Sequence, residues 1–195
     1  MNARTPVALT ACALVLLVLA GCAKPYDYTN FRQHRPRSIL VMPPQNESQS
    51  VNAAWSYQST VTRPLAERGY YVFPVAVVDR LMKEDGVSPN KAAEILGADA
   101  ILYVTLEQYG TKQQVLNAAT LVKLRGQLVD ARSGVLLWER RFAIQHNSNL
   151  GSGGILGDST DAAHNLAGSA NVRFFGDRDL GLLYGPYHPR YGKDE

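Results

Sequence analysis

Two stretches of alternating side chains, joined by a tight turn, constrain the fold of this chain more than any other feature. In residues 115–130, apolar side chains alternate with Lys123, Arg125 and Gln127, and residues 135–145 repeat the alternation. A period of two places successive side chains on opposite faces of a strand. The intervening DARSG ends in a glycine that can adopt the positive φ of a hairpin turn. The pattern therefore predicts an antiparallel hairpin with one dry and one wet face. Its dry face holds Val122, Leu124, Leu128, Leu136, Trp138, Phe142 and Ile144.

One charged residue interrupts the dry face of this hairpin. Arg140 lies between Trp138 and Phe142 on the same side of the second strand. With Glu139 and Arg141 beside it, we expect Arg140 at an exposed strand end, since charged side chains are rarely buried without a partner.

Further apolar runs predict three more strands. Residues 38–42 (SILVM) and 70–73 are short runs ended by proline, and residues 99–109 are apolar on both faces. Helical spacing predicts helices over residues 52–68, 75–84, 89–96 and about 160–175. Hydrophobic residues make up 46% of the chain, enough to build a core. We predict a single α/β or α+β domain with a mixed five-stranded sheet and helices packed mainly on one side.

The first twenty-two residues predict export and a lipid anchor. Residues 7–20 are apolar except for one threonine, and fourteen residues are too few to span a bilayer but fit a signal peptide. Leu19-Ala20-Gly21-Cys22 resembles the lipobox of bacterial lipoproteins. That resemblance implies cleavage between Gly21 and Cys22 and acylation of Cys22, including palmitate. Because Ala23 rather than Asp follows the cysteine, it also implies sorting to the outer membrane, with the domain facing the periplasm and surface exposure left open.

Four segments follow from these features. Residues 1–21 form the signal peptide, 22–37 a lipidated tether, 38–175 the globular α/β domain and 176–195 an irregular C-terminal tail. Tyr184, Tyr187 and Tyr191 lie in this tail, separated by glycine and proline. Tyrosine combines apolar area with a polar tip, so these three residues are candidates for an interface.

Motifs for catalysis are missing from the chain. Residues 151–154 are glycine-rich but lack the Lys-Ser/Thr of a phosphate loop, and residues 177–179 (DRD) favour a solvated turn. The four histidines have no spacing typical of a metal pair. We therefore expect no catalytic residues, no metal and no cofactor. The net charge of +3 does not favour nucleic-acid binding.

Several segments resemble a family of Gram-negative lipoproteins that includes a neisserial member. They are SILVMPPQNES, VNAAWSYQSTVTRPLAERGYYVFP, LGADAILYVTLEQYGT and LVDARSGVLLWE, which fall within residues 38–142. The resemblance implies a domain similar to the amino-terminal domain of TolB and to CsgG-type lipoproteins, which bind proteins and are not enzymes. It supplies no catalytic residues.

Three functions can be weighed on this basis. The favoured one is a lipid-anchored accessory or scaffold protein of an outer-membrane secretion or envelope-assembly complex. Its partners would be the membrane through Cys22, envelope proteins including a CsgG-like lipoprotein, and further copies of itself. The alternative is a regulator of peptidoglycan synthesis, for which residues 23–37 make a rather short tether. An envelope hydrolase is the least favoured.

Overall fold

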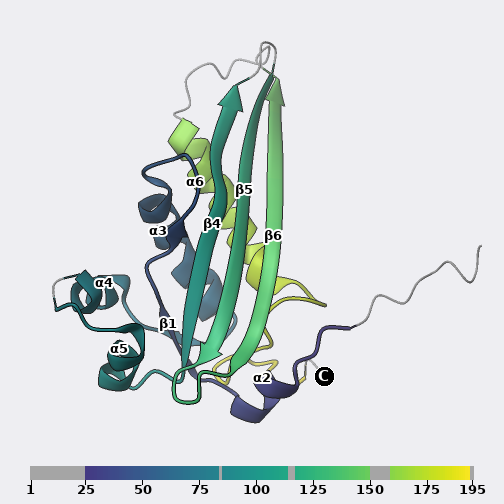
Figure 1. Cartoon of the computed structure of the whole chain (residues 1–195). Helices are drawn as coiled ribbons and strands as arrows, with labels where there is room; N and C mark the ends of the chain where they lie inside the picture. Colours follow the sequence, from purple (N-terminus) through teal and green to yellow (C-terminus); the bar gives the residue numbers. More distant parts are fainter. Residues whose placement is uncertain (1–24, 84, 114–116, 150–158, 194–195) are drawn as a thin grey trace, which may run out of the picture.

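Three long antiparallel strands dominate the computed structural model, which describes residues 25–83, 85–113, 117–149 and 159–193. They are β4 (Ala100–Gln113), β5 (Asn117–Asp130) and β6 (Leu136–Asn149), as Figure 1 shows. The predicted hairpin is confirmed, because β5 and β6 pair antiparallel with Trp138 opposite Leu128. One member of the predicted dry face is wrong: the register shifts between Leu128 and Val129, so Leu136 is 41% exposed and Leu137 is buried instead. Its turn is closed by the Asp130 carboxylate, which accepts a 2.7 Å hydrogen bond from the backbone N–H of Ser133.

Shorter parallel strands complete a mixed sheet on the other side of β4. β1 (Ser38–Val41) pairs parallel with both β4 and β3 (Tyr71–Val72), which gives the order β3-β1-β4-β5-β6. All five predicted strands are therefore present. A sixth strand, β2 (Gln45–Asn46), was not predicted and pairs parallel with β4. Pro43 and Pro44 end β1. Gln45 and Asn46 of β2 then pair with Thr105 and Leu106 on the open edge of β4.

Two helices cover one face of the sheet. α3 (Ala53–Glu67) and α6 (Ser159–Gly176) pack against each other and against β4, β5 and β6 (Figure 1). The rings of Trp138, Phe174 and Phe175 fill the lower part of this layer and are fully buried. Gly126 in β5 makes room for them, since a Cβ there would lie 2.7 Å from the Phe174 ring.

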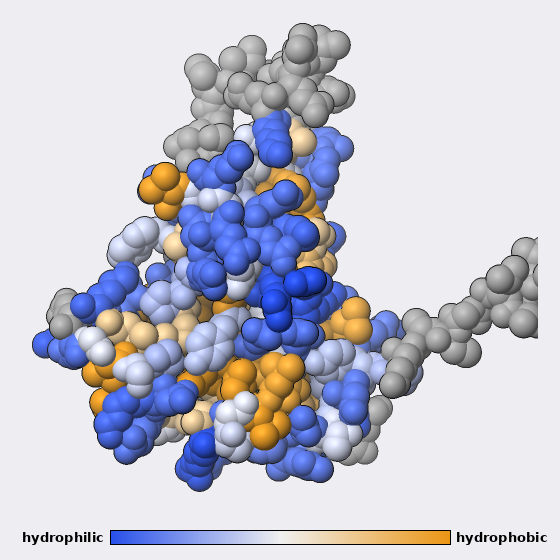
Figure 2. Space-filling view, in the orientation of Figure 1, coloured by the Kyte–Doolittle hydropathy of each residue, from blue (hydrophilic) through white to orange (hydrophobic). Residues whose placement is uncertain are grey.

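The opposite face is covered only at one end. α4 (Val75–Lys83) and α5 (Pro89–Leu96) pack over Leu40, Met42 and Ile101 in a second, smaller core. Beyond that point the face is open, and Figure 2 shows it as largely hydrophilic. Glu107 there pairs with Lys123 at 2.8 Å and with Arg141 at 3.3 Å. Residues 99–109, which are apolar on both faces, are therefore covered on both faces only in the first part of β4.

The segment predicted as a tether is folded onto the domain in its second part, which corrects the sequence interpretation. α2 (Thr29–His34) buries Phe31, and Tyr28 before it is 8% exposed. The sequence gives only a weak indication of this packing, because Tyr26, Tyr28 and Phe31 are the aromatic residues of an otherwise polar segment that face the core. Residues 177–193 contain neither helix nor strand among those described, and Leu182 anchors them at 1% exposure.

Candidate functional site

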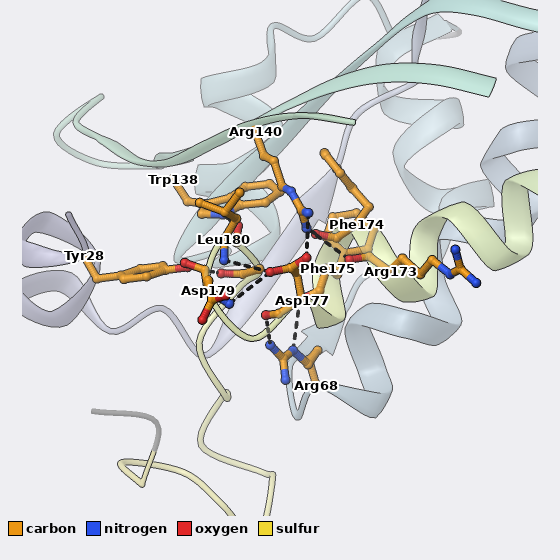
Figure 3. Close-up of polar contacts among 11 residues, drawn as sticks. Tyr28, Arg68, Trp138, Arg140, Arg173, Phe174, Phe175, Asp177, Asp179 and Leu180 are labelled. Atoms are coloured by element: carbon orange, nitrogen blue, oxygen red, sulfur yellow. Dashed lines mark hydrogen bonds and ion pairs between the residues drawn. The ribbon is translucent and has the colours of Figure 1, made fainter. Parts of the chain in front are cut away.

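The two terminal segments of the described chain meet at one end of the domain (Figure 3). The Tyr28 hydroxyl donates to the Gly181 carbonyl oxygen at 2.5 Å, and the Trp138 indole N–H donates to the Leu180 carbonyl oxygen at 2.9 Å. Burial raises the pKa of Tyr28 to about 12, so its hydroxyl keeps its proton at neutral pH. Both aromatic side chains thus hold residues 177–193, the C-terminal segment, in place.

Arg140 lies at the centre of this contact. Its side chain is only 8% exposed and pairs with Asp177 at 2.8 Å. The same guanidinium donates to the carbonyl oxygens of Arg173 and Phe174 at the end of α6 (Figure 3). A cation at a helix C-terminus satisfies carbonyl groups that have no partner within the helix. The expectation of an exposed strand end at Arg140 is therefore wrong, because partners distant in sequence surround it.

Asp177 is held by three donors. Partial burial alone would raise its pKa, but the backbone N–H groups of Asp179 and Leu180 and the Arg140 guanidinium outweigh this effect. The pKa of Asp177 is consequently lower than its ordinary value. The turn at residues 177–179 was expected to be solvated. Its Asp177 carboxylate instead closes the turn and pairs with Arg140, which is a structural role.

Arg68 fixes the following part of the C-terminal segment. Its guanidinium donates to the Phe175 carbonyl oxygen at 3.0 Å and to the Leu182 carbonyl oxygen at 2.5 Å. It also lies 4.3 Å from the centre of the Tyr184 ring, which stacks on His188 at 4.0 Å. The tail therefore packs on the C-terminal end of α3.

The three tyrosines predicted as an interface have different surroundings. Tyr184 is half-buried under Arg68 and His188, whereas Tyr187 is 71% exposed and Tyr191 is 39% exposed. Tyr184 and Tyr191 line a small cavity of about 30 Å³ together with Arg32 of α2 and Arg35, which follows that helix. The structure thus leaves Tyr187 and Tyr191 available at the surface and gives Tyr184 a structural role.

The remaining predicted positions do not form a chemical centre. Gly21, Cys22 and the glycine-rich residues 151–154 lie outside the described residues. Across the described ranges, no three His, Cys, Asp or Glu side chains gather so that they could hold a metal ion. None of the helices within those ranges is both long and apolar enough to cross a membrane.

A groove between α3 and α4 was missed by sequence reasoning. It has a volume of about 660 Å³ and is lined by Trp55, Val75 and Ala76 together with polar residues of both helices. Trp55 is 68% exposed, and the Lys83 ammonium lies 4.7 Å from the centre of its ring. The signal was present in the sequence, because Trp55 falls off the apolar stripe of its helix that includes Tyr57, Val61 and Leu65.

Comparison with known proteins identifies the family of the chain. Residues 26–187 match the family model described as "Putative lipoprotein GNA1162-like". A Neisseria meningitidis serogroup B protein described as a "Putative lipoprotein" is 41% identical over 163 residues, which cover 77% of this chain and 76% of the relative.

Solved structures extend this likeness to three dimensions. The crystal structure of lipoprotein GNA1162 from Neisseria meningitidis is 41% identical and matches with a TM-score of 0.55, covering 69% of this chain and 99% of that one. The PelC dodecamer from Paraburkholderia phytofirmans matches with a TM-score of 0.47 at 18% identity, covering 71% and 86% of the two chains. The chain belongs to the family described as "Putative lipoprotein GNA1162-like", and it shares the single mixed α/β domain of the neisserial lipoprotein.

Proposed function

We propose that this protein is a lipid-anchored accessory protein of an outer-membrane secretion or envelope-assembly complex, and that it acts by binding other envelope proteins. The observation that carries the proposal is Cys22, which follows Leu-Ala-Gly at the end of a fourteen-residue apolar run. Membership of a lipoprotein family supports the anchor. Acylation with two or more chains would hold the domain on the membrane without spanning it.

The hydrogen bonds of the buried polar side chains support a binding role rather than catalysis, because these bonds link elements of the fold. Arg140 joins β6 to the end of α6, and the Tyr57 hydroxyl donates to Asn171 at 2.7 Å between α3 and α6. Gln58 donates to Asp79 at 3.1 Å and so links α3 to α4. Each of these side chains connects elements of the fold, which is a structural role. We infer that the protein has no catalytic centre.

The exposed aromatic side chains are the proposed contacts for envelope partners. Tyr187 and Trp55 are 71% and 68% exposed, and Trp55 borders the groove between α3 and α4. Trp and Tyr dominate binding energy at protein interfaces. A CsgG-like lipoprotein of a shared envelope complex is the proposed partner.

The short distance between the anchor and the domain weighs against a regulator that reaches through the peptidoglycan. The chain is fixed to the domain from Tyr26, whose hydroxyl oxygen accepts the backbone N–H of Glu139 at 2.7 Å. Four residue steps separate Cys22 from Tyr26, and an extended chain covers at most about 14 Å over that length. A role close to the membrane surface is therefore favoured.

The anchor is tested by Cys22→Ser in cells fed labelled palmitate. We expect loss of the label and of membrane sedimentation, with a wild-type level of folded domain. A variant that is still labelled and still sediments with outer membranes would overturn the proposal.

The binding role is tested by photo-crosslinking in intact cells. A photoreactive residue replaces Trp55 or Tyr187, and the exposed Glu94 of α5 provides the control position. We expect a discrete adduct with an envelope protein from at least one aromatic position and none from residue 94. Absence of adducts at both aromatic positions would contradict the proposal.

A further inference from the structure

The short reach of the anchor determines which surface of the domain meets the membrane. Tyr28 is 8% exposed and bonded to Gly181, so the chain is already part of the domain four to six residues after Cys22. If Cys22 carries the lipid, as proposed above, the surface around Tyr26 and Tyr28 lies within about 14 Å of the headgroups. A domain on such a short tether meets the bilayer at high effective concentration.

This surface is formed by α2, the turn between β5 and β6, the start of β6 and the C-terminal segment up to residue 193. Asn30 of α2 donates to the Leu136 carbonyl oxygen at 3.1 Å, and Tyr28 bonds the segment at Gly181. Arg32 of α2 and Tyr191 of the C-terminal segment line one cavity at this end, where Figure 1 labels α2. We call this region the anchor-proximal surface.

The charges of the anchor-proximal surface are unbalanced. Its acids are mostly engaged: Asp99 pairs with Arg37 at 3.3 Å, and Asp177 pairs with Arg140 at 2.8 Å. Asp27 accepts from Thr29 at 2.6 Å, whereas Asp179 is an exposed acid in this region. Several exposed cations, by contrast, make no ion pair within the described part of the chain. They are Arg32, Arg35, Arg132, Arg178, Arg190 and Lys193.

Exposed apolar side chains lie among these cations. Leu136 and Leu180 are 41% and 43% exposed, and Tyr191 lines the same small cavity as Arg32 and Arg35. Figure 2 shows a hydrophobic patch over the lower ends of β5 and β6. A surface that combines arginines with partly exposed leucines and a tyrosine has the chemistry of proteins that rest in the headgroup region.

The backbone conformation of Arg35 also supports a binding role for this surface. Arg35 ends α2 in the left-handed conformation with φ 40, and it is the one non-glycine residue with positive φ in the described chain. Glycine or asparagine would adopt this conformation at lower cost. The Arg35 Nε–H donates to the Arg32 carbonyl oxygen at 3.1 Å, which holds the guanidinium beside Arg32, and its two terminal nitrogens can bind phosphate through two hydrogen bonds.

We propose that the anchor-proximal surface binds anionic phospholipid headgroups of the membrane that holds the anchor. Arg32 and Arg35 bind the lipid phosphates, and Leu136 and Leu180 enter the headgroup region. The domain is thereby docked on the bilayer, and the upper ends of β4–β6 point away from it. Docking leaves the groove beside Trp55 accessible to protein partners, because Trp55 lies near the start of α3, whereas the C-terminal segment packs on the end of that helix.

The test uses the full lipidated chain, extracted from membranes and reconstituted in phosphatidylcholine vesicles with or without phosphatidylglycerol. A fluorophore is attached to Gln33→Cys in α2 or to Lys112→Cys near the upper end of β4, both exposed positions. A nitroxide on the lipid headgroup quenches a fluorophore that lies at the membrane surface. We expect strong quenching at residue 33 in anionic vesicles and weak quenching at residue 112.

The arginines are tested in the Gln33→Cys protein with Arg32→Gln and Arg35→Gln combined. Each basic residue near an anionic bilayer strengthens binding about fivefold, so the ratio of docked to undocked domain should fall about 25-fold. The matched control removes two exposed cations elsewhere, Arg63→Gln in α3 and Lys91→Gln in α5, and should leave quenching unchanged. Higher salt should weaken docking of the unsubstituted protein, because it screens exposed charges.

The outcomes separate this proposal from the anchor itself. Protein that sediments with the vesicles but is quenched equally at residues 33 and 112 would overturn the docking proposal and leave the anchor intact. Equal quenching at residue 33 in the double arginine variant and in its control would also overturn the docking proposal and leave the anchor intact. Protein that fails to sediment with any vesicle would overturn the anchor, and the docking proposal with it.

Discussion

At the scale of single residues, Arg140 shows how one charge can be buried in the face of a sheet. Its guanidinium contacts two carbonyl oxygens at the end of α6, the Asp177 carboxylate, and the ring of Phe142 at 5.2 Å. Only its Nε lacks a partner among the described buried side-chain atoms. The arginine therefore ties β6, α6 and the C-terminal segment together.

Replacement of Arg140 should be strongly destabilising. We expect Arg140→Ala to lower the free energy of unfolding by about 3 kcal/mol, because the helix carbonyl groups and Asp177 lose a buried charged donor. Urea unfolding monitored by Trp138 fluorescence would measure the change. Arg141→Ala is the matched control and should cost less than about 1 kcal/mol, since its pair with Glu107 is exposed. Equal losses in the two variants would contradict this account.

Asp177 should make the stability of the protein sensitive to acid. Its pKa is lower in the folded protein than in the unfolded chain, so the unfolded state binds protons more readily. The stabilisation is complete near neutral pH and is lost as the pH falls from about 5 through the folded pKa. Asp177→Asn should therefore lower the free energy of unfolding near neutral pH, and the gap to the wild type should narrow at about pH 3.

Urea unfolding at several pH values would check this dependence. In an Arg140→Ala background the effect of Asp177→Asn should be smaller, because the two groups interact directly. A gap to the wild type that stays constant with pH would show that the carboxylate charge is not involved.

At the scale of elements, the C-terminal segment depends on the close approach of two backbones at the end of α3. Gly69 has φ +85, and a Cβ there would collide with the backbone of His188 and the carbonyl oxygen of Gly185. The Gly185 N–H donates to the Arg68 carbonyl oxygen at 2.8 Å, and the Tyr187 N–H donates to that of Gly69 at 3.1 Å. The segment can dock there only because residue 69 lacks a side chain.

Gly69→Ala should release the C-terminal segment. We expect a cost of about 3 kcal/mol from the collision and the left-handed backbone together. Trypsin cleavage after Arg178 or Arg190 should become at least about tenfold faster, because the segment opens locally. Gly134→Ala is the control, since Gly134 has φ +72 with no atom within 4 Å of its Cβ position. It should cost about 1 kcal/mol and leave cleavage of the segment unchanged.

At the scale of the whole molecule, the two cores on opposite faces of the sheet differ in the apolar area that they bury. The core between α3, α6 and the sheet buries Trp138, Phe174 and Phe175, whereas α5 fully buries only Ala92 and Ala93. Less apolar area buried means a lower free energy of local opening. We expect backbone amides of α4 and α5 to exchange with deuterium at least about tenfold faster than those of α3. Equal protection of both pairs of helices in mass-spectrometric exchange would contradict this expectation.

The five main strands and four of the helices could be predicted because their signals are local. The alternation around Leu124 and Trp138, the prolines that end β1 and β3, and Gly97 after α5 each act within a few residues. β2 and α2 were not predicted, because two polar residues and a short polar helix acquire their structure from β4 and from the core around Phe31.

Sequence by itself determined most of the wet and dry faces of the hairpin, because alternation depends only on neighbouring residues, and it alone carries the prediction of a lipobox at Cys22. Tertiary structure alone decided that Arg140 is buried, that Tyr184 is less exposed than Tyr187, and that Tyr26 is already bonded to the domain at Glu139. Each depends on partners far apart in sequence, with Arg140 and Asp177 separated by 37 positions. Whether a charge is buried is set by what packs around it, and that packing exists only once the chain has folded.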